Sequence, residues 1–368
     1  MLVPGRIKSV PEDFVVEELP AYEPSGEGNH LYLRFTKRNL TTDVAVRAIA
    51  EALAVRARDV GVAGMKDKVA VTTQTISVEI PREQQSGDAF AARAAALAID
   101  GVVIHEARRH TNKLRTGHLA GNRFTLLVRG IPKNGLESAR ERLAQIAREG
   151  LPNAFGAQRF GRAGDNAERA KKWLAGEEQG PRDPRMKRLL WSSLQSAAFN
   201  ALLDARVANG TWATPVLGDI LKKRDTGGLF VCTDVQADRE RATAGEVSPT
   251  GPIVGIKMRA AEGEAAVLEG EILAKILGEG FNLAATKPLG EGTRRVLRLW
   301  VENMHTEAVV ETDSGEQDVS IRVNFVLPKG AYATTVLGAA FQLQDGLQSA
   351  GSGPGSGPEE PSEEPDVE

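Results

Sequence analysis

The sequence predicts an α+β fold, built on a mixed β-sheet with flanking helices. Strand-like and helix-like patterns are mixed through the first 150 residues, which favours this class. The composition shifts after Asn153 toward helical patterns, and sheet-like alternation returns at residues 319–327 (VSIRVNFVL). A chain of 368 residues, 41% hydrophobic and 26% charged, is long enough for about two or three domains with buried cores.

Strand patterns are most regular in the first third of the chain. Residues 30–36 (HLYLRFT) alternate apolar and polar side chains, which is the period of a half-buried strand. Residues 71–80 are rich in β-branched side chains, which favour strands. Shorter runs predict further strands at residues 5–10, 15–19, 102–108 and 124–129.

Helices are predicted between and after these strands. Thr41 or Thr42 can cap the first of them. The others are predicted at residues 89–98, 136–148, 165–175 and 187–207. Residues 210–290 hold many glycines and short strands, with a turn at residues 249–252 (PTGP). A chain that begins with a sheet, becomes helical and returns to a strand suggests an inserted domain.

Composition and missing signatures exclude several kinds of protein. The single cysteine, Cys232, excludes an internal disulfide and a zinc site with two thiolates, and it fits a reducing cytoplasm. No apolar run approaches the roughly 18 residues of a membrane span, and residues 1–10 lack the apolar core of a signal peptide. P-loop, H-E-x-x-H and G-x-S-x-G motifs are all missing, which disfavours metal-dependent and serine hydrolases, and no metal site is predicted.

Charge is unevenly distributed along the chain. Residues 351–368 carry six acidic residues and no basic one, so the rest of the chain is mildly basic although the net charge is −3. We expect residues 346–368 to form a disordered acidic tail, because Gly, Ser, Pro and Glu bury too little apolar surface. From residue 107 to residue 136 the chain has no acidic residue, and its basic residues are Arg108, Arg109, Lys113, Arg115, Arg123, Arg129 and Lys133. This window indicates either a solvated loop or a surface for RNA or another polyanion.

Two short segments stand out for their chemistry. Asp67 lies between two predicted strands with Lys66 and Lys68 on either side. A loop aspartate is usually a turn residue, but neighbouring cations favour the ionised form that a nucleophile needs. In the segment NAFGAQRFG at residues 153–161, two Phe-Gly pairs disfavour a plain helix. Arg159 in this segment can contact phosphate or a base, or the segment can form a packed domain junction.

Seven short blocks, taken together, resemble the tRNA pseudouridine synthase D (TruD) family. They occur in the family's order and span about residues 5–340. The blocks are PEDFVVE at 11–17, GMKDK at 64–68 with Thr72 and Gln74, GNRF at 121–124, NAFGAQRFG at 153–161, QSAAFN at 195–200, TGP at 250–252 and LPKGAYAT at 327–334.

This resemblance implies an architecture and a reaction. A pseudouridine synthase core is expected at residues 1–155 and 306–345, with an inserted α+β domain of the TruD type at residues 156–305. The implied reaction converts a uridine of tRNA, by family uridine 13, to pseudouridine without a metal or organic cofactor. The C1′–N1 bond breaks, the uracil rotates, and C5 bonds to C1′.

The resemblance also implies roles for individual residues. Asp67 matches the catalytic aspartate, which acts on sugar or base as a nucleophile or base. Phe14, Asn122 and Tyr332 match substrate-contacting positions, and Tyr332 stands where a phenylalanine is expected. Lys8 and Phe124 match supporting positions, and Lys66 can either support Asp67 or bind phosphate. The residues expected to hold the RNA backbone are Arg108, Arg109, Lys113, Arg115 and Arg159.

Two other functions stay open from the residues alone. A noncatalytic RNA-binding or folding-helper protein would use the same basic surface, but it gains little from a carboxylate beside phosphates. A nuclease or glycosidase normally needs a metal cluster or a second positioned carboxylate, and the early blocks offer only Glu12 and Glu17 for that role. We expect a cytoplasmic enzyme that acts on tRNA, without membrane association or an evident obligate protein partner, which allows a monomer.

Overall fold

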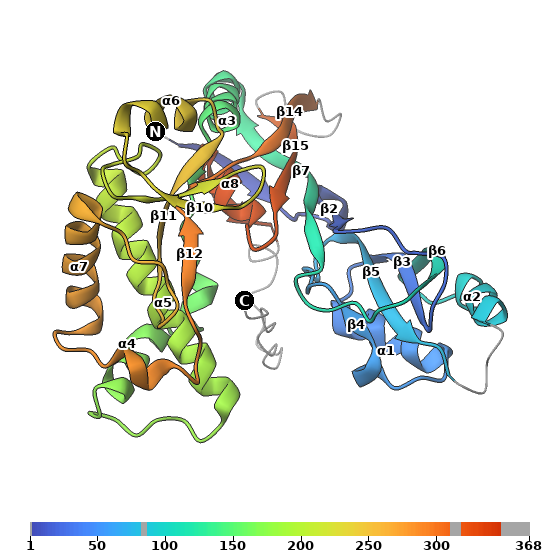
Figure 1. Ribbon diagram of the computed structural model, residues 1–368. Helices are drawn as coiled ribbons and strands as arrows, with labels where there is room; N and C mark the ends of the chain where they lie inside the picture. The colour runs from blue at the N-terminus through green and yellow to red at the C-terminus, as the bar shows by residue number, and fades with distance from the viewer. Residues whose placement is uncertain (1, 82–86, 310–317, 347–368) are drawn as a thin grey trace. The chain divides into compact units, whose positions relative to one another are not determined.

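The computed structural model describes residues 2–81, 87–309 and 318–346 (Figure 1). The chain divides into two compact units, unit 1 with residues 1–149 and 301–368, and unit 2 with residues 150–300. The boundaries expected from the sequence lie a few residues later, and the roles assigned to the two parts stay a prediction. The predicted acidic tail lies outside the described residues from residue 347 onward.

Unit 1 contains a mixed β-sheet, which confirms the predicted α+β class. Its strands follow the order β14-β15-β7-β2-β5-β3-β6, while β1 joins β7 to β16 and β4 pairs with β5. β2 and β5 are parallel, as are β1 and β16, and the other pairs are antiparallel. The strands are β1 (Val3–Ile7), β2 (Phe14–Pro20), β3 (His30–Arg38), β4 (Gly61–Val62), β5 (Val71–Glu79), β6 (Val102–His110), β7 (Leu119–Pro132), β14 (Glu302–Val309), β15 (Asp318–Pro328) and β16 (Phe341–Asp345).

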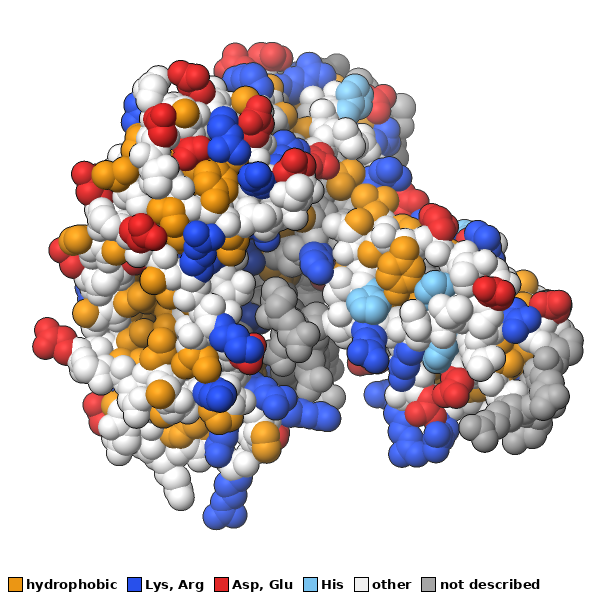
Figure 2. Space-filling model, viewed as in Figure 1, with side chains coloured by type: hydrophobic (Ala, Val, Ile, Leu, Met, Phe, Trp, Pro, Cys, Tyr) orange, Lys and Arg blue, Asp and Glu red, His pale blue; other side chains and the backbone are white. Residues whose placement is uncertain are grey.

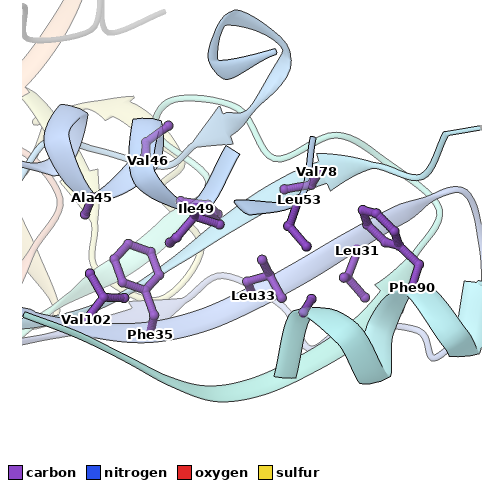
Figure 3. Close-up of a cluster of buried hydrophobic side chains, with 12 residues drawn as sticks. Leu31, Leu33, Phe35, Ala45, Val46, Ile49, Leu53, Val78, Phe90 and Val102 are labelled. Atoms are coloured by element: carbon purple, nitrogen blue, oxygen red, sulfur yellow. The ribbon is translucent and has the colours of Figure 1, made fainter. Parts of the chain in front are cut away.

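The helices of unit 1 bury apolar side chains against this sheet. They are α1 (Thr42–Ala52), α2 (Gly87–Ala95), α3 (Leu136–Glu149) and α8 (Ala333–Ala340). Figure 3 shows Leu33 and Phe35 of β3 facing Ile49 of α1, with Phe90 of α2 at the other end of the cluster. Each of these side chains contributes about 1.5–3 kcal/mol through removal from water. The cluster holds α1 and β3 in place, and the site described below begins where β3 ends.

The sequence predicted most of these elements but missed α8, β16 and the edge strand β14. Its segment ENMHTEAV is mostly exposed, so it lacks the apolar alternation by which a half-buried strand is identified. Thr41, one of two candidate caps, is the residue that caps α1, because its Oγ1 accepts a hydrogen bond from the N–H of Val44 at 3.2 Å. Among the described residues, no helix is both long and apolar enough to cross a membrane.

Unit 2 combines a small sheet with long helices. Its sheet order is β10-β9-β11-β12, and β13 pairs with β8. The strands are β8 (Leu151–Pro152), β9 (Ile220–Lys223), β10 (Leu229–Val231), β11 (Val247–Ile253), β12 (Thr293–Val296) and β13 (Arg298–Leu299). The helices are α4 (Asn166–Leu174), α5 (Pro184–Ala208), α6 (Val235–Thr243) and α7 (Gly263–Leu277).

The turn predicted at residues 249–252 was wrong, because these residues belong to the buried strand β11. β11 pairs with β9 as far as Pro249 and with β12 from Thr250 onward. Each proline therefore lies near the end of a ladder, where a missing N–H is tolerated. Gly251 is tightly packed, since a Cβ there would lie 3.0 Å from side-chain atoms of Leu297 and Phe199.

Candidate active site

Three neighbouring strands of unit 1 bring predicted site residues to one face of the sheet. Glu18 of β2 lies opposite Asn122 of β7, which lies opposite Leu327 of β15. Directly opposite residues point to the same face, as do residues two positions apart. Phe14 and Phe124 therefore share this face with Asn122.

Asp67 reaches the same region from the loop between β4 and β5. Its side chain is 54% exposed, and Oδ2 lies 3.5 Å from Nζ of Lys8. Nζ of Lys8 also lies 4.4 Å from the centre of the Phe14 ring. Lys8 thus connects the loop carboxylate to the sheet face, and the carboxylate stays open to an incoming substrate.

The turn that presents Lys8 and Phe14 is firmly held. Lys8 has a φ of +56°, a left-handed backbone that a non-glycine residue adopts only where its surroundings impose it. Asp13, in the same turn, is buried, and its Oδ2 accepts a hydrogen bond from the N–H of Val10 at 3.1 Å. Arg129 of β7 donates to both carboxylate oxygens of Asp13 at 2.7–3.0 Å. A strained backbone maintained in this way is common at functional sites.

A fully buried lysine anchors the loop of Asp67. Nζ of Lys37, at the end of β3, donates to the main-chain oxygens of Asp67 at 2.7 Å and of Leu40 at 2.6 Å. Burial lowers the pKa of Lys37 to about 8, although the charge of Asp67 acts in the opposite direction. Lys37 therefore fixes the main chain from which the Asp67 side chain extends.

We expect Lys37→Met to destabilise the protein by about 1–3 kcal/mol, because two main-chain oxygens lose their donor. The difference should also depend on pH. The pKa of lysine is about 10.4 in an unfolded chain and about 8 for Lys37 in the folded protein, so between these values the unfolded chain binds more protons. Lys37 therefore makes wild-type stability rise with pH in this window. Urea unfolding between these pH values should show a smaller rise in the free energy of unfolding for Lys37→Met than for the wild type. Parallel plots of this free energy against pH would contradict the lowered pKa of Lys37.

Lys66 precedes Asp67 but points into the protein. Its side chain is 7% exposed, with Nζ 3.1 Å from Oε2 of Glu18 and donating to Oδ1 of Asn122 at 2.7 Å. The Glu18 side chain is 3% exposed, and its Oε1 accepts from the N–H of Thr75 at 3.2 Å. Of the two roles considered for Lys66, this burial favours support of the site over a contact with phosphate.

A threonine completes the anchoring of the loop. Oγ1 of Thr42 accepts from the N–H of Lys66 at 2.9 Å and donates to Oε1 of Gln74 at 3.2 Å. Thr42 therefore holds the N–H of Lys66, and Lys37 holds the main-chain oxygen of Asp67, so the dipeptide is hydrogen-bonded at both ends. The geometry of Asp67 is therefore set by buried groups, even though its own side chain is exposed.

The aromatic residues of the site form a buried floor. Phe14 is 2% exposed and Phe124 is 6% exposed, and their rings meet edge to face at 6.3 Å. Phe124 stacks on Phe325 of β15 at 5.3 Å. Because Lys8 covers the Phe14 ring, a base can stack on that ring only after Lys8 moves aside. The burial of Phe124 between two other rings fits the supporting position that the resemblance implies for it.

Tyr332 lies at the start of α8, half-buried, just after β15. β15 carries the chain to the Asn122 end of β7, where Leu327 and Pro328 pair with Asn122 and Gly121. Within the described part of the chain, no hydrogen bond or ring contact joins Tyr332 to Asp67, Phe14 or Asn122. If Tyr332 contacts the substrate as predicted, the substrate itself must therefore connect Tyr332 to the other site residues.

The basic residues of the window at 107–136 differ in their surroundings. Arg108, Lys113 and Arg115 are exposed, although Nε of Arg108 lies 3.5 Å from Glu106. Arg109 is less free, because it donates to the main-chain oxygen of Gly28 at 3.0 Å. On the face shown in Figure 2, acidic side chains lie among the basic ones.

Two further residues of this window are neutralised in space by acids that are distant in the sequence. Arg123 pairs with Glu17 at 2.6 Å, and Arg129 with Asp13 at 2.7 Å. The run without acidic residues therefore overstates the local positive field. Arg159 lies in unit 2, where it donates to Oγ of Ser192 at 2.6 Å and of Ser196 at 3.2 Å.

Sequence reasoning missed two residues of the site, Glu18 and Lys37. Glu18 follows the buried positions Phe14 and Val16 at intervals of two, so the alternation of β2 signals that it points inward. Lys37 similarly continues the buried alternation of β3. Glu12 and Glu17, the other candidate carboxylates, pair instead with Arg38 and with Arg34 and Arg123.

Comparisons with known proteins agree over nearly the whole chain. The family model described as tRNA pseudouridine synthase D (TruD) matches residues 3–178 and 181–339. A tRNA pseudouridine synthase D of Anaeromyxobacter sp. (strain Fw109-5) is 46% identical over 341 residues, covering 90% of this chain and 91% of the relative. One from Thermus thermophilus is 41% identical over 335 residues, covering 91% of this chain and 88% of the relative.

A solved structure shares the fold. The crystal structure of a candidate tRNA pseudouridine synthase D from Methanosarcina mazei superposes with a TM-score of 0.76 and covers 95% of both chains. At 23% sequence identity, this likeness concerns the fold alone.

Proposed function

The chain belongs to the tRNA pseudouridine synthase D family, and on that basis we propose that it isomerises uridine 13 of tRNA with Asp67 as the catalytic residue. The family makes the protein an isomerase that converts uridine of tRNA to pseudouridine. The observation that supports the choice of Asp67 is its exposed carboxylate beside Lys8, on a loop held from below by Lys37. The cytoplasmic location predicted from the single cysteine suits a tRNA substrate.

The reaction requires that the target base leave its stack. A reactive atom inside a helix is out of reach, so enzymes of this kind extrude the nucleotide into a pocket. Asp67 can then act as a nucleophile or base on the sugar or the uracil, and Lys8 places a positive charge beside it. When C1′–N1 breaks and C5 bonds to C1′, C5 loses a proton and N1 gains one. The product is an isomer, so the atoms balance without a co-reactant.

The other predicted residues would bind the RNA. Asn122 would hydrogen-bond to the edge of the base, and Phe14 and Tyr332 would lie against its faces. Exposed basic residues would contribute to RNA binding by neutralising the charge of phosphates. In unit 1 these residues are Arg108, Lys113 and Arg115, and also Arg109, which is partly occupied by its hydrogen bond to Gly28. Arg159 in unit 2 stays a candidate for the same role.

The proposal is tested by mapping pseudouridine in an unmodified tRNA transcript after incubation with the purified protein. Carbodiimide treatment followed by primer extension should reveal one new pseudouridine, at position 13. A transcript with cytidine at that position serves as the control and should show none. Product only at other positions would contradict the assignment of uridine 13, and tRNA binding without product would favour the noncatalytic RNA-binding alternative.

A further inference from the structure

We propose that Glu18 and Lys66 fix the amide of Asn122 so that it offers only its N–H donor to the base, and that this donor selects uridine by reading O4 of uracil. The inference rests on the proposed function, because it concerns how the same site recognises its base. It assigns Glu18 and Lys66 as positioning residues and Asn122 as the group that sets specificity.

The orientation of the amide follows from the chemistry of its partner. A lysine ammonium has three donors and no acceptor. The Asn122 atom that lies 2.7 Å from Nζ of Lys66 must therefore be the carbonyl oxygen, Oδ1. Nδ2, on the other arm of the planar group, points away from Lys66. In the described part of the chain no group accepts a hydrogen bond from Nδ2 of Asn122, and the residue is only half-buried.

Lys66 itself has little freedom to release this amide. Its Nζ lies 3.1 Å from Oε2 of Glu18, and both side chains are more than nine-tenths buried. Oε1 of Glu18 is held by the N–H of Thr75 at 3.2 Å. Breaking a buried ion pair leaves an uncompensated charge, so neither side chain can turn away cheaply. The orientation of Asn122 is thus imposed by a desolvated pair beneath it.

The fixed amide is linked to the proposed catalytic residue through the main chain of Lys66. Lys66 and Asp67 are consecutive, so one contacts Asn122 while the other presents its carboxylate to solvent. Asn122 also shares its sheet face with Phe14, which contacts Lys8, the partner of Asp67. We therefore expect a base that reaches Asp67 to meet Asn122 as a hydrogen-bond donor and not as an acceptor.

A donor can favour uracil over cytosine at one position only. Both carry O2, whereas uracil has an acceptor, O4, at the carbon where cytosine has the donor N4 amino group. A donor directed at O2 would accept either base, and one directed at N3 would favour cytosine. Selection of uridine by a donor thus requires O4. With cytidine, two donors would face each other unpaired, which weakens binding by on the order of ten- to hundredfold.

The test measures binding and not turnover. All variants are made in an Asp67→Asn background, so that uridine is not consumed, and dissociation constants are compared for tRNA with uridine or cytidine at the target position. The parent should bind the uridine form at least about tenfold more tightly. Lys66→Met and Glu18→Gln should bring the ratio near one, and Lys66→Arg should restore part of it. Asn122→Asp should favour cytidine, because its second oxygen accepts from N4.

Glu17→Gln is the matched control, since it makes the same chemical change one residue earlier in β2. The side chain of Glu17 lies on the other face of the sheet, where it pairs with Arg34 and Arg123. Its ratio should equal that of the parent, and melting curves check that every variant folds. Equal affinity of the parent for both RNAs would overturn the inference, as would an unchanged ratio in folded Lys66→Met and Glu18→Gln. Turnover of wild-type protein on uridine tRNA is measured separately, so failure of the proposed function is seen independently.

Discussion

Asp67→Asn should lower pseudouridine formation by about 10⁴-fold while leaving tRNA affinity nearly unchanged. Loss of one member of a catalytic group typically has an effect of this size. The amide keeps the size of the side chain but can act neither as a nucleophile nor as a base toward the uridine. Because the side chain is 54% exposed, the substitution leaves no buried group unpaired, and the fold should persist. Single-turnover rates and filter binding with the same transcript measure both effects.

Asp59→Asn provides the control for this substitution. Asp59 lies in a short helical turn of the same unit, and it pairs with Arg56 as Asp67 pairs with Lys8. This variant should form pseudouridine at the wild-type rate. Wild-type turnover by Asp67→Asn would remove Asp67 from the reaction and would move the search to other carboxylates of unit 1.

Lys8→Met should lower kcat by on the order of 10²-fold, the usual effect of removing one charged group that stabilises a reacting site. Lys8 is the cation 3.5 Å from Asp67, and its contact with the Phe14 ring shields it partly from water. We expect KM to change less than kcat, since the Lys8 ammonium pairs with Asp67 and a base displaces it from the Phe14 ring. Stopped-time assays over a range of tRNA concentrations separate the two constants.

The matched variant for Lys8 is Arg6→Met, which removes an exposed cation from β1, two residues earlier. It should leave kcat unchanged. Lys8→Arg keeps the charge and should retain more activity than Lys8→Met. If Lys8→Met had wild-type kcat, the charge beside Asp67 would have no part in the reaction.

Much of unit 1 could be predicted from the sequence because its elements carry regular patterns. The alternation of HLYLRFT predicted β3, and the β-branched run after Asp67 predicted β5. The GMKDK segment was correctly placed in a loop between strands. These features depend on local sequence alone, and local sequence is sufficient to identify them.

The interior of the site could not be predicted in the same way. Lys66 meets Asn122, which is 56 positions further along the chain, and Lys37 meets the main chain of Asp67 across 30 positions. Such contacts depend on the strand order, in which β2 lies between β7 and β5. No local pattern distinguishes a lysine that binds phosphate from one that is buried against Glu18. The ion pairs of Arg123 and Arg129 escaped prediction for the same reason.

The central claim is that an extruded uridine meets Asp67 at the sheet face that bears Asn122. A structure of the Asp67→Asn variant bound to unmodified tRNA tests it most directly. We predict that the target uridine lies outside its stack, with C1′ or the uracil ring about 3–3.5 Å from the side chain at position 67 and O4 beside Nδ2 of Asn122. A uridine bound elsewhere on the protein, or still stacked in the RNA and out of reach of this loop, would contradict the account.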